Sequence, residues 1–186
     1  MPSGSNPDFK TLSFEKVDHA STFSGFHCGI PELDEFIHNE LEDFMGMECE
    51  AFCVRSGKDV VGMFCLSAHS LFLSDAVKEK MDNGLKPAPE IDSIPYWEYM
   101  NSFPAVEIAY LAVDERFQSK GIGSFILEEI MDYVAYQPDN NYDFVTVRAY
   151  NREEYSAIPF YQKCGFTAAA ERKANTNLFM YRVVQR

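Results

Sequence analysis

The chain has 186 residues, which is long enough for one well-buried domain and short for two. Hydrophobic residues make up 46% and aromatic residues 15% of it, and no apolar run approaches the roughly 18 residues of a membrane span, so a globular protein is expected. The net charge of −13 disfavours nucleic acids as partners and favours cationic ones, although simple solubility is the more ordinary explanation of such a charge.

Metal and disulfide chemistry find no support in the sequence. The five cysteines contain no C-x-x-C pair, and the four histidines form no H-E-x-x-H motif. We therefore expect neither a disulfide framework nor a metal site. Residues 1–8 are expected to be a loose N-terminus without a signal peptide, and residues 9–186 a single domain in a cytoplasmic protein.

The first half of the chain is predicted to alternate strand and helix. Phe9–Val17 fits a first strand, and a helix begins at Pro31, has acidic residues in its first turn and ends at Gly46. Glu48–Arg55 and Val60–Ser67 are rich in β-forming residues and flank a short turn, which indicates an antiparallel hairpin.

Residues 74–104 are interpreted as an insertion. A short helix is predicted over Ser74–Gly84, and four prolines after it exclude long regular structure. The aromatic residues of the segment suggest that it packs onto the domain as a lid over a substrate pocket. They are Tyr96, Trp97, Tyr99 and Phe103.

The central stretch, Ala105–Tyr136, has the order strand, glycine loop, helix. A strand over Ala105–Val113 leads to the loop Gln118–Gly123, and a helix follows. A glycine loop that opens a helix presents free backbone N–H groups to an anion, which suits a phosphate. The dinucleotide fingerprint fails because its third glycine is missing, and the Walker motif fails because Lys120 precedes its glycine. An ordinary strand-to-helix turn remains the alternative.

The last part of the chain is predicted to contain a strand over Phe144–Ala149, a helix over Ser156–Lys163, and a closing hairpin of Phe166–Glu171 and Asn177–Val184. With the preceding elements, this order gives a mixed sheet with helices on both faces.

Two motifs in this order resemble those of the GNAT superfamily of N-acetyltransferases. The first is Gln-x-x-Gly-x-Gly after a strand ending Leu-Ala-Val-Asp, and the second is Phe160–Phe166, which resembles the segment F-Y-x-x-x-G-F. The resemblance covers about Ala105–Phe166. It implies an α/β fold, the GNAT acyl-CoA N-acyltransferase fold, with a mixed, mostly antiparallel sheet of six to seven strands flanked by helices.

The resemblance also implies acetyl-CoA as the acyl donor and assigns residues to it. The glycine loop would hold the pyrophosphate, the end of the preceding strand would bulge to admit pantetheine and polarise the thioester carbonyl, and Phe160 would contact the cofactor. The loop residues are Gln118, Ser119, Lys120, Gly121, Ile122, Gly123 and Ser124, and the strand residues are Leu111, Ala112 and Val113.

Two residues are the candidates for catalysis. Glu107 occupies a position where some GNAT enzymes carry a glutamate that removes the proton of the amine, directly or through water, and Tyr161 resembles the family tyrosine that protonates the leaving thiolate. The alternatives are a glutamate on a solvent-facing strand and a tyrosine that only packs. The family often has an asparagine seven positions before this tyrosine. Glu154 stands there instead and Asn151 lies ten before it, which weakens a CoA role for Asn151.

A third segment resembles the opening of the GNAT branch that includes toxins acetylating aminoacyl-tRNA. It is Phe26–Ile37, which contains Phe-x-Cys-Gly and Leu-Asp-x-Phe-Ile. Cys28 has no base beside it in the sequence, and we interpret it as structural. The overall charge argues against tRNA, and the toxins tend to have an apolar residue where Glu107 stands.

The sequence therefore favours acetyl transfer, by direct attack, to a primary amine of a small molecule or peptide. A toxin-like enzyme acting on aminoacyl-tRNA and a non-catalytic CoA-binding module are the alternatives. Nucleic acid is disfavoured without excluding tRNA, no membrane contact is expected, and a homodimer is left open.

Overall fold

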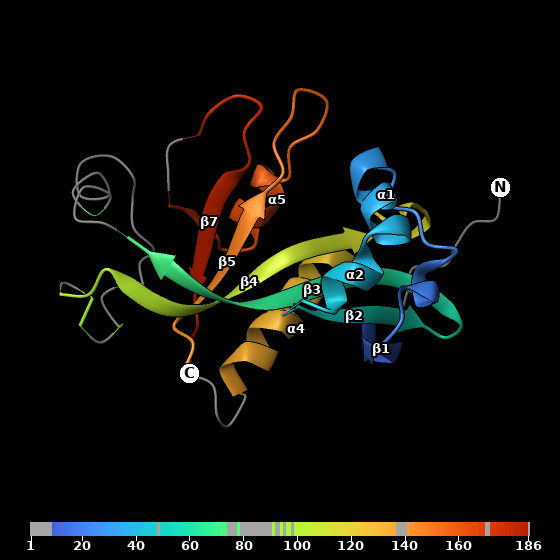
Figure 1. Ribbon diagram of the computed structural model, residues 1–186, viewed down its shortest axis with the longest axis horizontal. Helices are drawn as coiled ribbons and strands as arrows, with labels where there is room; N and C mark the ends of the chain where they lie inside the picture. The colour runs from blue at the N-terminus through green and yellow to red at the C-terminus, as the bar shows by residue number, and fades with distance from the viewer. Residues whose placement is uncertain are drawn as a thin grey trace. The chain divides into compact units, whose positions relative to one another are not determined.

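A computed structural model describes most of the chain (Figure 1). The described residues are 9–47, 49–73, 78, 91, 94, 96, 97, 99–136, 141–169 and 172–185. The predicted loose N-terminus and most of the predicted insertion, including all of its expected helix except Lys78, lie outside them.

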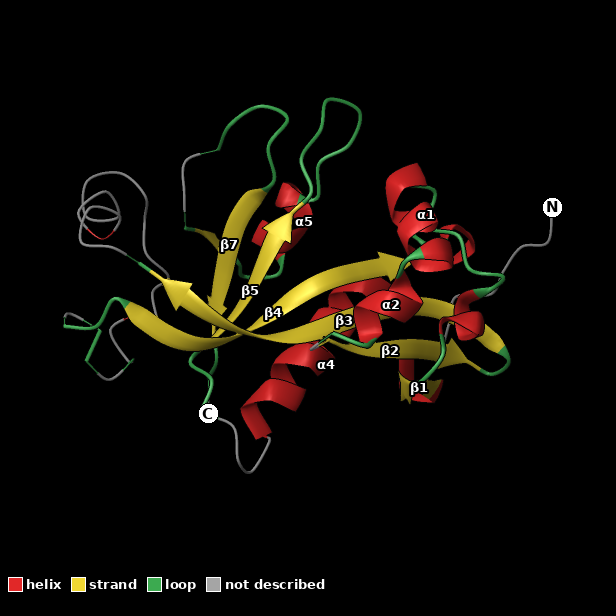
Figure 2. Cartoon of the chain, in the orientation of Figure 1, coloured by secondary structure: helices red, strands yellow, loops and turns green. Residues whose placement is uncertain are grey.

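The described residues form seven strands, four helices and three short 3₁₀ turns (Figure 2). The strands are β1 (Leu12–Val17), β2 (Cys49–Ser56), β3 (Asp59–Phe72), β4 (Ser102–Val113), β5 (Phe144–Ala149), β6 (Thr167–Ala168) and β7 (Leu178–Val183). The helices are α1 (Pro31–Asn39), α2 (Leu41–Met45), α4 (Ile122–Tyr136) and α5 (Ile158–Lys163). The 3₁₀ turns are η1 (Phe9–Thr11), η2 (Ala20–Phe23) and η4 (Glu115–Phe117).

The strands form one sheet in the order β1-β2-β3-β4-β5-β7-β6. β4 and β5 run parallel, whereas the pairs β1–β2, β2–β3, β5–β7 and β6–β7 are antiparallel. This confirms the predicted mixed, mostly antiparallel sheet of six to seven strands.

The chain divides into two compact units, and each is described by itself. The first unit consists of residues 1–67 and 109–129, and the second of residues 68–108 and 130–186. β3, β4 and α4 each contribute residues to both. The prediction of a single domain over 9–186 stays a prediction.

In the first unit, helices cover both faces of the sheet, as predicted. Met63 and Cys65 of β3 belong to a buried cluster that also contains Phe36 and Ile37 of α1. Gly62, which points to the opposite face, lies against α4 so closely that an added Cβ would stand 2.7 Å from Cδ1 of Ile126. Because side chains alternate along a strand, the two faces of β3 pack against different helices.

The predicted single helix from Pro31 to Gly46 is wrong in one respect, since it breaks at Glu40 into α1 and α2. The rings of Phe36 and Phe44 both pack on Tyr110, and their centroids are 5.5 Å apart. In a straight helix, residues eight positions apart are separated by about 12 Å along the axis. The break therefore lets both phenylalanines reach the same tyrosine.

Other boundaries differ from the predictions by a few residues. Phe9–Thr11 form the turn η1 before β1, β3 continues to Phe72, β4 begins at Ser102 with Pro104 inside it, and α5 begins at Ile158. The closing hairpin is shorter than predicted, because β6 contains two residues.

The second unit has its own apolar cluster at one end of its strands. Leu71 of β3, Phe103 of β4, Phe144 of β5 and Tyr181 of β7 are buried in it, together with Ile91 and Ile94 from the described part of the insertion. Trp97 packs on Phe103 with a centroid distance of 5.3 Å, and Phe103, itself a residue of the predicted insertion, packs on Phe144 of β5 at 5.5 Å. Tyr96 and Tyr99 differ from the predicted packing of the insertion, because both are exposed. A lid role for the segment stays a prediction.

Candidate active site

Asp114 holds the segment that leads from β4 to the glycine loop in the first unit. Its side chain is 1% exposed and accepts hydrogen bonds from the backbone N–H of Arg116 at 3.0 Å and from the Arg116 guanidinium at 2.8 and 3.0 Å. Its own N–H donates to the carbonyl of Val61 on β3. Asp114 therefore caps η4 and ties the end of β4 to the neighbouring strand.

Asp114→Ala is expected to destabilise the chain by about 1 to 2 kcal/mol, because the cap is lost and backbone donors at a buried site lose their acceptor. At this chain length that corresponds to a decrease in Tm of roughly 2 to 8 °C. Arg116→Ala is the matched control. Its side chain is 56% exposed, so its loss should cost less than about 1 kcal/mol. Equal melting temperatures for the two variants in a thermal scan would contradict the role of Asp114.

The segment before α1 holds the same loop from the other side. The amide nitrogen of Gln118 donates to the carbonyl of Cys28 at 2.7 Å and to that of Val113 at 2.9 Å. The carboxylate of Asp34 accepts the N–H groups of Cys28 at 2.7 Å and Gly29 at 3.1 Å, where Gly29 has φ +78°. The Phe-x-Cys-Gly segment and the glycine loop are therefore joined by hydrogen bonds. The side-chain nitrogen of Gln118 makes this connection, so it is already used within the protein.

The thiol of Cys28 has a structural environment. Burial raises its pKa to about 12, and the Asp34 carboxylate adds to the effect. Such a thiol is not a nucleophile near neutral pH. Asp34 is itself partly buried, which opposes ionisation, but the hydrogen bonds from the N–H groups of Cys28 and Gly29 lower its pKa overall.

The glycine loop has the backbone geometry of an anion site. Ser119 and Gly121 both have left-handed φ values, +60° and +85°, and α4 begins directly afterwards at Ile122. The first N–H groups of a helix have no acceptor within it, and no acidic residue stands in this first turn. The N–H groups of Gly121, Ile122 and Gly123 therefore suit a pyrophosphate.

Side chains stiffen this loop. The Lys120 ammonium donates to the carbonyl of Arg116 at 3.1 Å and lies 5.3 Å from the ring centre of Phe117. Phe9 packs on Phe125 and approaches Gly121, where an added Cβ would meet its ring at 3.4 Å. Leu111, Ala112 and Val113 lie at the end of β4, where Ala112 is buried and its two neighbours are half-buried.

In the second unit, α5 carries the predicted tyrosine. Tyr161 is buried between Phe160 and Phe166, with ring centroids 5.1 and 5.4 Å away. Burial strongly raises the pKa of its hydroxyl, with smaller contributions from Tyr155 and Cys164. The phenol is therefore protonated at neutral pH and can act as a proton donor.

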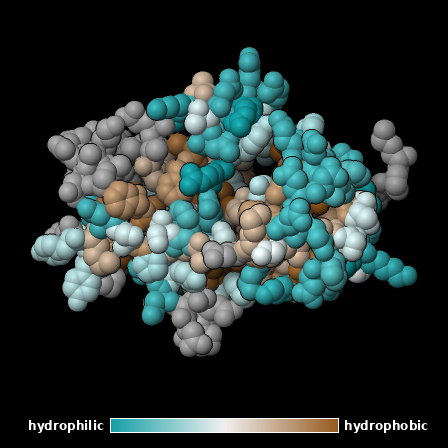
Figure 3. Space-filling model, viewed as in Figure 1, coloured by the Kyte–Doolittle hydropathy of each residue, from teal (hydrophilic) through white to brown (hydrophobic). Residues whose placement is uncertain are grey.

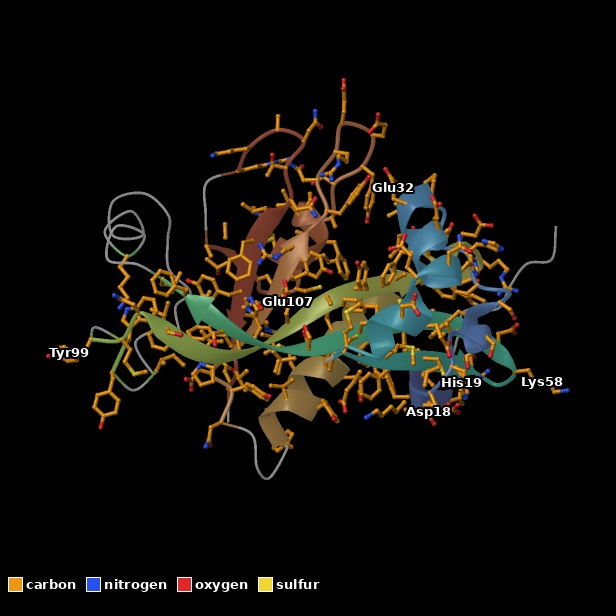
Figure 4. All side chains as sticks on the ribbon, in the orientation of Figure 1. Asp18, His19, Glu32, Lys58, Tyr99 and Glu107 are labelled. Atoms are coloured by element: carbon orange, nitrogen blue, oxygen red, sulfur yellow. The ribbon has the colours of Figure 1, made fainter. Side chains whose placement is uncertain are left out.

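Glu107 lies on β4 within a polar group (Figure 4). Its side chain is 17% exposed, its Oε1 is 3.2 Å from Nε of Arg148, and its Oε2 is 4.0 Å from Nε2 of His69. Nδ1 of His69 is 3.3 Å from Oγ1 of Thr146, which also lies 3.4 Å from the carbonyl of Val106. Glu107 is thus half-buried and paired, unlike a glutamate on an open strand.

The structure describes all of the predicted site residues, in two sets. The glycine loop and Leu111–Val113 belong to the first unit, and Glu107, Phe160 and Tyr161 to the second. Their roles stay predictions, which no observation here tests. Among the described residues, no group of three or more His, Cys, Asp or Glu side chains could hold a metal ion.

Residues 90–168 match the family of the acetyltransferase (GNAT) domain. This match contains the end of β4, the glycine loop, α4 and the tyrosine of α5. These residues form a GNAT acetyltransferase domain. The acyl donor of the GNAT domain is acetyl-CoA, and its reaction is acyl transfer, as the two motifs predicted.

Solved structures resemble this chain over nearly its whole length. A tyrosine-to-phenylalanine mutant of KacT is 22% identical, with a TM-score of 0.69, 94% of this chain covered and 95% of that one. AtaT complexed with acetyl-methionyl-tRNAfMet is 21% identical, with a TM-score of 0.64 and coverage of 90% and 93%. A mutant AtaT toxin bound to the C-terminus of the antitoxin AtaR and acetyl-CoA is 18% identical, with a TM-score of 0.66 and coverage of 93% for both chains.

These likenesses show that the fold of the KacT and AtaT structures extends over nearly the whole chain. No curated protein matches the sequence significantly. Among the described residues, no helix is both long and apolar enough to cross a membrane.

Two loops of the second unit lie beside α5 and carry Arg152, Arg172 and Lys173 against Glu153 and Glu154, a net charge of +1. Asn151 is buried, and its amide nitrogen donates to the carbonyls of Lys173 and Thr176, while its Oδ1 accepts from Arg172. Arg152 donates to the side chain of Asn177 at 2.8 Å. Loops 150–157 and 172–177 are therefore braced together, and Asn151 has a structural task, consistent with the doubt about a CoA role for it. We call them the basic loop pair.

The basic loop pair projects from the sheet (Figure 1), and its first loop has a hydrophilic surface at the top of Figure 3. That loop also holds Tyr155, which is exposed and near enough to Tyr161 to raise the pKa of its hydroxyl. A ligand on this surface would therefore lie near the candidate proton donor.

Sequence reasoning missed His69, Thr146, Arg148 and the tasks of Asp34 and Gln118. The alternation of Phe144, Thr146 and Arg148 on β5 is visible in the sequence, but their partners on β3 and β4 follow from strand register. No local pattern specifies that register.

Proposed function

We propose that this chain transfers the acetyl group of acetyl-CoA to the α-amino group of an aminoacyl-tRNA. The observation that carries the proposal is the likeness, over 90% of this chain and 93% of that one, to AtaT complexed with acetyl-methionyl-tRNAfMet. KacT and the other AtaT structures extend this likeness to further members of the same toxin group.

The charge distribution supports the proposal. Residues 141–186 contain seven Lys and Arg against four Asp and Glu, whereas residues 1–140 contain nine against 25. The net charge of −13 is therefore the sum of +3 for the C-terminal part and −16 for the rest. A polyanion can approach the basic part, which includes the basic loop pair and α5 with Tyr161.

The sequence-based preference for a small or peptidic amine depended on the total charge and on Glu107, which stands where the toxins tend to have an apolar residue. Because the charge is segregated, the charge argument loses its force. Aminoacyl-tRNA combines a primary amine, which Glu107 can attract, with a polyanion, which the basic loop pair can attract. An antitoxin is the corresponding protein partner, as in the AtaT structure with the C-terminus of AtaR.

Each part of the proposed mechanism has a residue. The N–H groups at the start of α4 hold the pyrophosphate of acetyl-CoA, and backbone at Leu111–Val113 lines the pantetheine and polarises the thioester carbonyl. Tyr161 gives its proton to the sulfur as the C–S bond breaks. Glu107 attracts the amine through its charge.

A cell-free translation reaction tests this function. Adding the protein with acetyl-CoA should stop peptide synthesis, because an acetylated α-amino group cannot accept a peptide. Omitting acetyl-CoA should restore synthesis, and so should replacing the protein by its Tyr161→Phe variant. Undiminished translation at protein concentrations that acetylate a model amine would argue for the small-amine alternative.

A further inference from the structure

A row of three side chains, two of them polar, crosses the sheet of the second unit beside its apolar cluster. Leu71, Phe144 and Tyr181 belong to the apolar cluster, and two residues along their strands stand His69, Thr146 and Phe179. Because side chains alternate along a strand, these six lie on one face. The polar row therefore has an apolar wall at one end.

The contacts of Thr146 decide which nitrogen of His69 carries the proton. Oγ1 of Thr146 is buried and lies 3.4 Å from the carbonyl oxygen of Val106, which can only accept a hydrogen bond. If the hydroxyl donates to Val106, its lone pair can accept from Nδ1–H of His69 at 3.3 Å. This arrangement satisfies both contacts, whereas a Thr146 proton directed at His69 leaves the Val106 contact without a hydrogen.

In this tautomer, Nε2 of His69 has a lone pair and faces Glu107. Oε2 of Glu107 is 4.0 Å away, which is too long for a hydrogen bond between them, and Oε1 is bound to Arg148. The two atoms thus present acceptors to the same space. An ammonium group, which has only donors, can bridge them.

The charged and ring groups that face His69 come from three strands. Glu107 lies on β4, Arg148 on β5, and the ring of Phe179 on β7 packs edge-on to the imidazole at 5.9 Å. Arg148 in turn lies 5.2 Å over Phe179. His69 is therefore oriented by a threonine, a phenylalanine and a carboxylate, and its side chain retains 25% exposure.

We infer that His69 is the general base of the acetyl transfer and that Glu107 anchors the ammonium group. This inference rests on the proposed function and replaces the direct proton removal by Glu107 that the sequence suggested. Oε1 of Glu107 is held by Arg148, whereas Nε2 of His69 presents a lone pair to the ammonium group.

The protons and bonds of the step balance. The ammonium group gives one proton to Nε2 of His69, which releases it to solvent. The freed lone pair forms the N–C bond to the acetyl carbonyl carbon, and the C–S bond breaks. The sulfur takes a proton from Tyr161, and the second proton lost by the nitrogen replaces it through solvent. The net products are the amide, CoA thiol and one proton.

The rates of His69→Gln and of the wild type on charged tRNA, measured as a function of pH, test whether His69 is the base. At about pH 7 the α-amino group, which titrates near 8, is still mostly protonated while a free imidazole is mostly neutral, so the variant should be roughly 30- to 100-fold slower in kcat/KM. Near pH 9 most of the amine has lost its proton unaided, and the deficit should shrink by about tenfold or more.

A deficit that is equal at all pH values would overturn the inference, since a purely structural defect acts independently of the protonation of the amine. His19→Gln is the matched control, because His19 is exposed in the first unit (Figure 4) and should show the wild-type profile. Full activity of His69→Gln at about pH 7, where the α-amino group is mostly protonated, would equally exclude His69 as the base.

A second measurement needs no acceptor and so separates this inference from the proposed function. Nitrogen-15 NMR of the histidine rings, with His69 assigned by its absence from the His69→Gln spectrum, should show Nδ1 protonated and Nε2 free at alkaline pH. Thr146→Val should remove that preference. The opposite tautomer in the wild type would overturn the inference, while failure to acetylate any charged tRNA would count against the proposed function alone.

Discussion

Tyr161→Phe should lower kcat for acetyl transfer on the order of 100- to 1,000-fold, while leaving acetyl-CoA affinity within a few-fold of the wild type. The hydroxyl is the only atom lost. The buried ring keeps its packing between Phe160 and Phe166, so the melting temperature should change little. Because burial raises the pKa of this hydroxyl, the proton is available at neutral pH.

Steady-state rates with saturating acetyl-CoA, together with calorimetric binding of CoA, provide the measurement. Tyr136→Phe is the matched control, because Tyr136 is exposed on α4 and belongs neither to the F-Y motif nor to the basic loop pair. If Tyr161→Phe turned over at the wild-type rate, the tyrosine would be a packing residue, which was the alternative stated from the sequence. The KacT and AtaT structures with a tyrosine replaced by phenylalanine make this substitution a natural first variant.

Arg172→Glu combined with Lys173→Glu should raise KM for charged tRNA on the order of 30-fold, with little effect on kcat. Both residues belong to the basic loop pair, and their reversal replaces attraction of phosphates by repulsion. The slope of log(1/KM) against log(salt) should become shallower by about two, since each lost phosphate contact removes about one unit.

Lys58→Glu is the control for a charge reversal elsewhere. Lys58 projects from the turn between β2 and β3 in the first unit (Figure 4), and reversal of its charge should leave KM unchanged. A model amine without phosphates should be acetylated equally by all variants. Equal KM values for charged tRNA in the reversed and control variants would remove the basic loop pair from acceptor binding.

The elements that depend on local spacing were predictable from the sequence. The glycine loop, α4 and β5 follow from residues that are neighbours in the chain, and β5 has the predicted bounds. Tyr161 could be singled out because its motif is contiguous. The GNAT domain itself was therefore accessible from two short segments.

Features that depend on distant pairing were not predictable. The break at Glu40 follows from Tyr110, which lies 70 residues later on another element. The contacts of Glu107 with His69 and Arg148 follow from the register of three strands. A sequence alone does not place these side chains together, so the role of Glu107 was predicted without its neighbour His69.

The preference for a small or peptidic acceptor rested partly on the total charge, which is a poor guide to a binding surface. A total charge of −13 averages over the chain and hides a C-terminal part with a surplus of basic residues. The electrostatic field at a binding surface depends on nearby charges, because salt screens charges beyond about 8 to 10 Å. Charge counted by segment is therefore the better guide to a polyanionic substrate.

The most direct test of the proposed function is mass spectrometry of charged tRNA after incubation with the protein and acetyl-CoA. Nuclease digestion releases the aminoacyl-adenosine from the 3′ end of the tRNA. We predict that it gains the mass of one acetyl group on its α-amino nitrogen, and that this gain disappears with Tyr161→Phe. An unmodified aminoacyl-adenosine, under conditions in which the same protein acetylates a small primary amine or a peptide, would contradict the assignment of aminoacyl-tRNA as the acceptor.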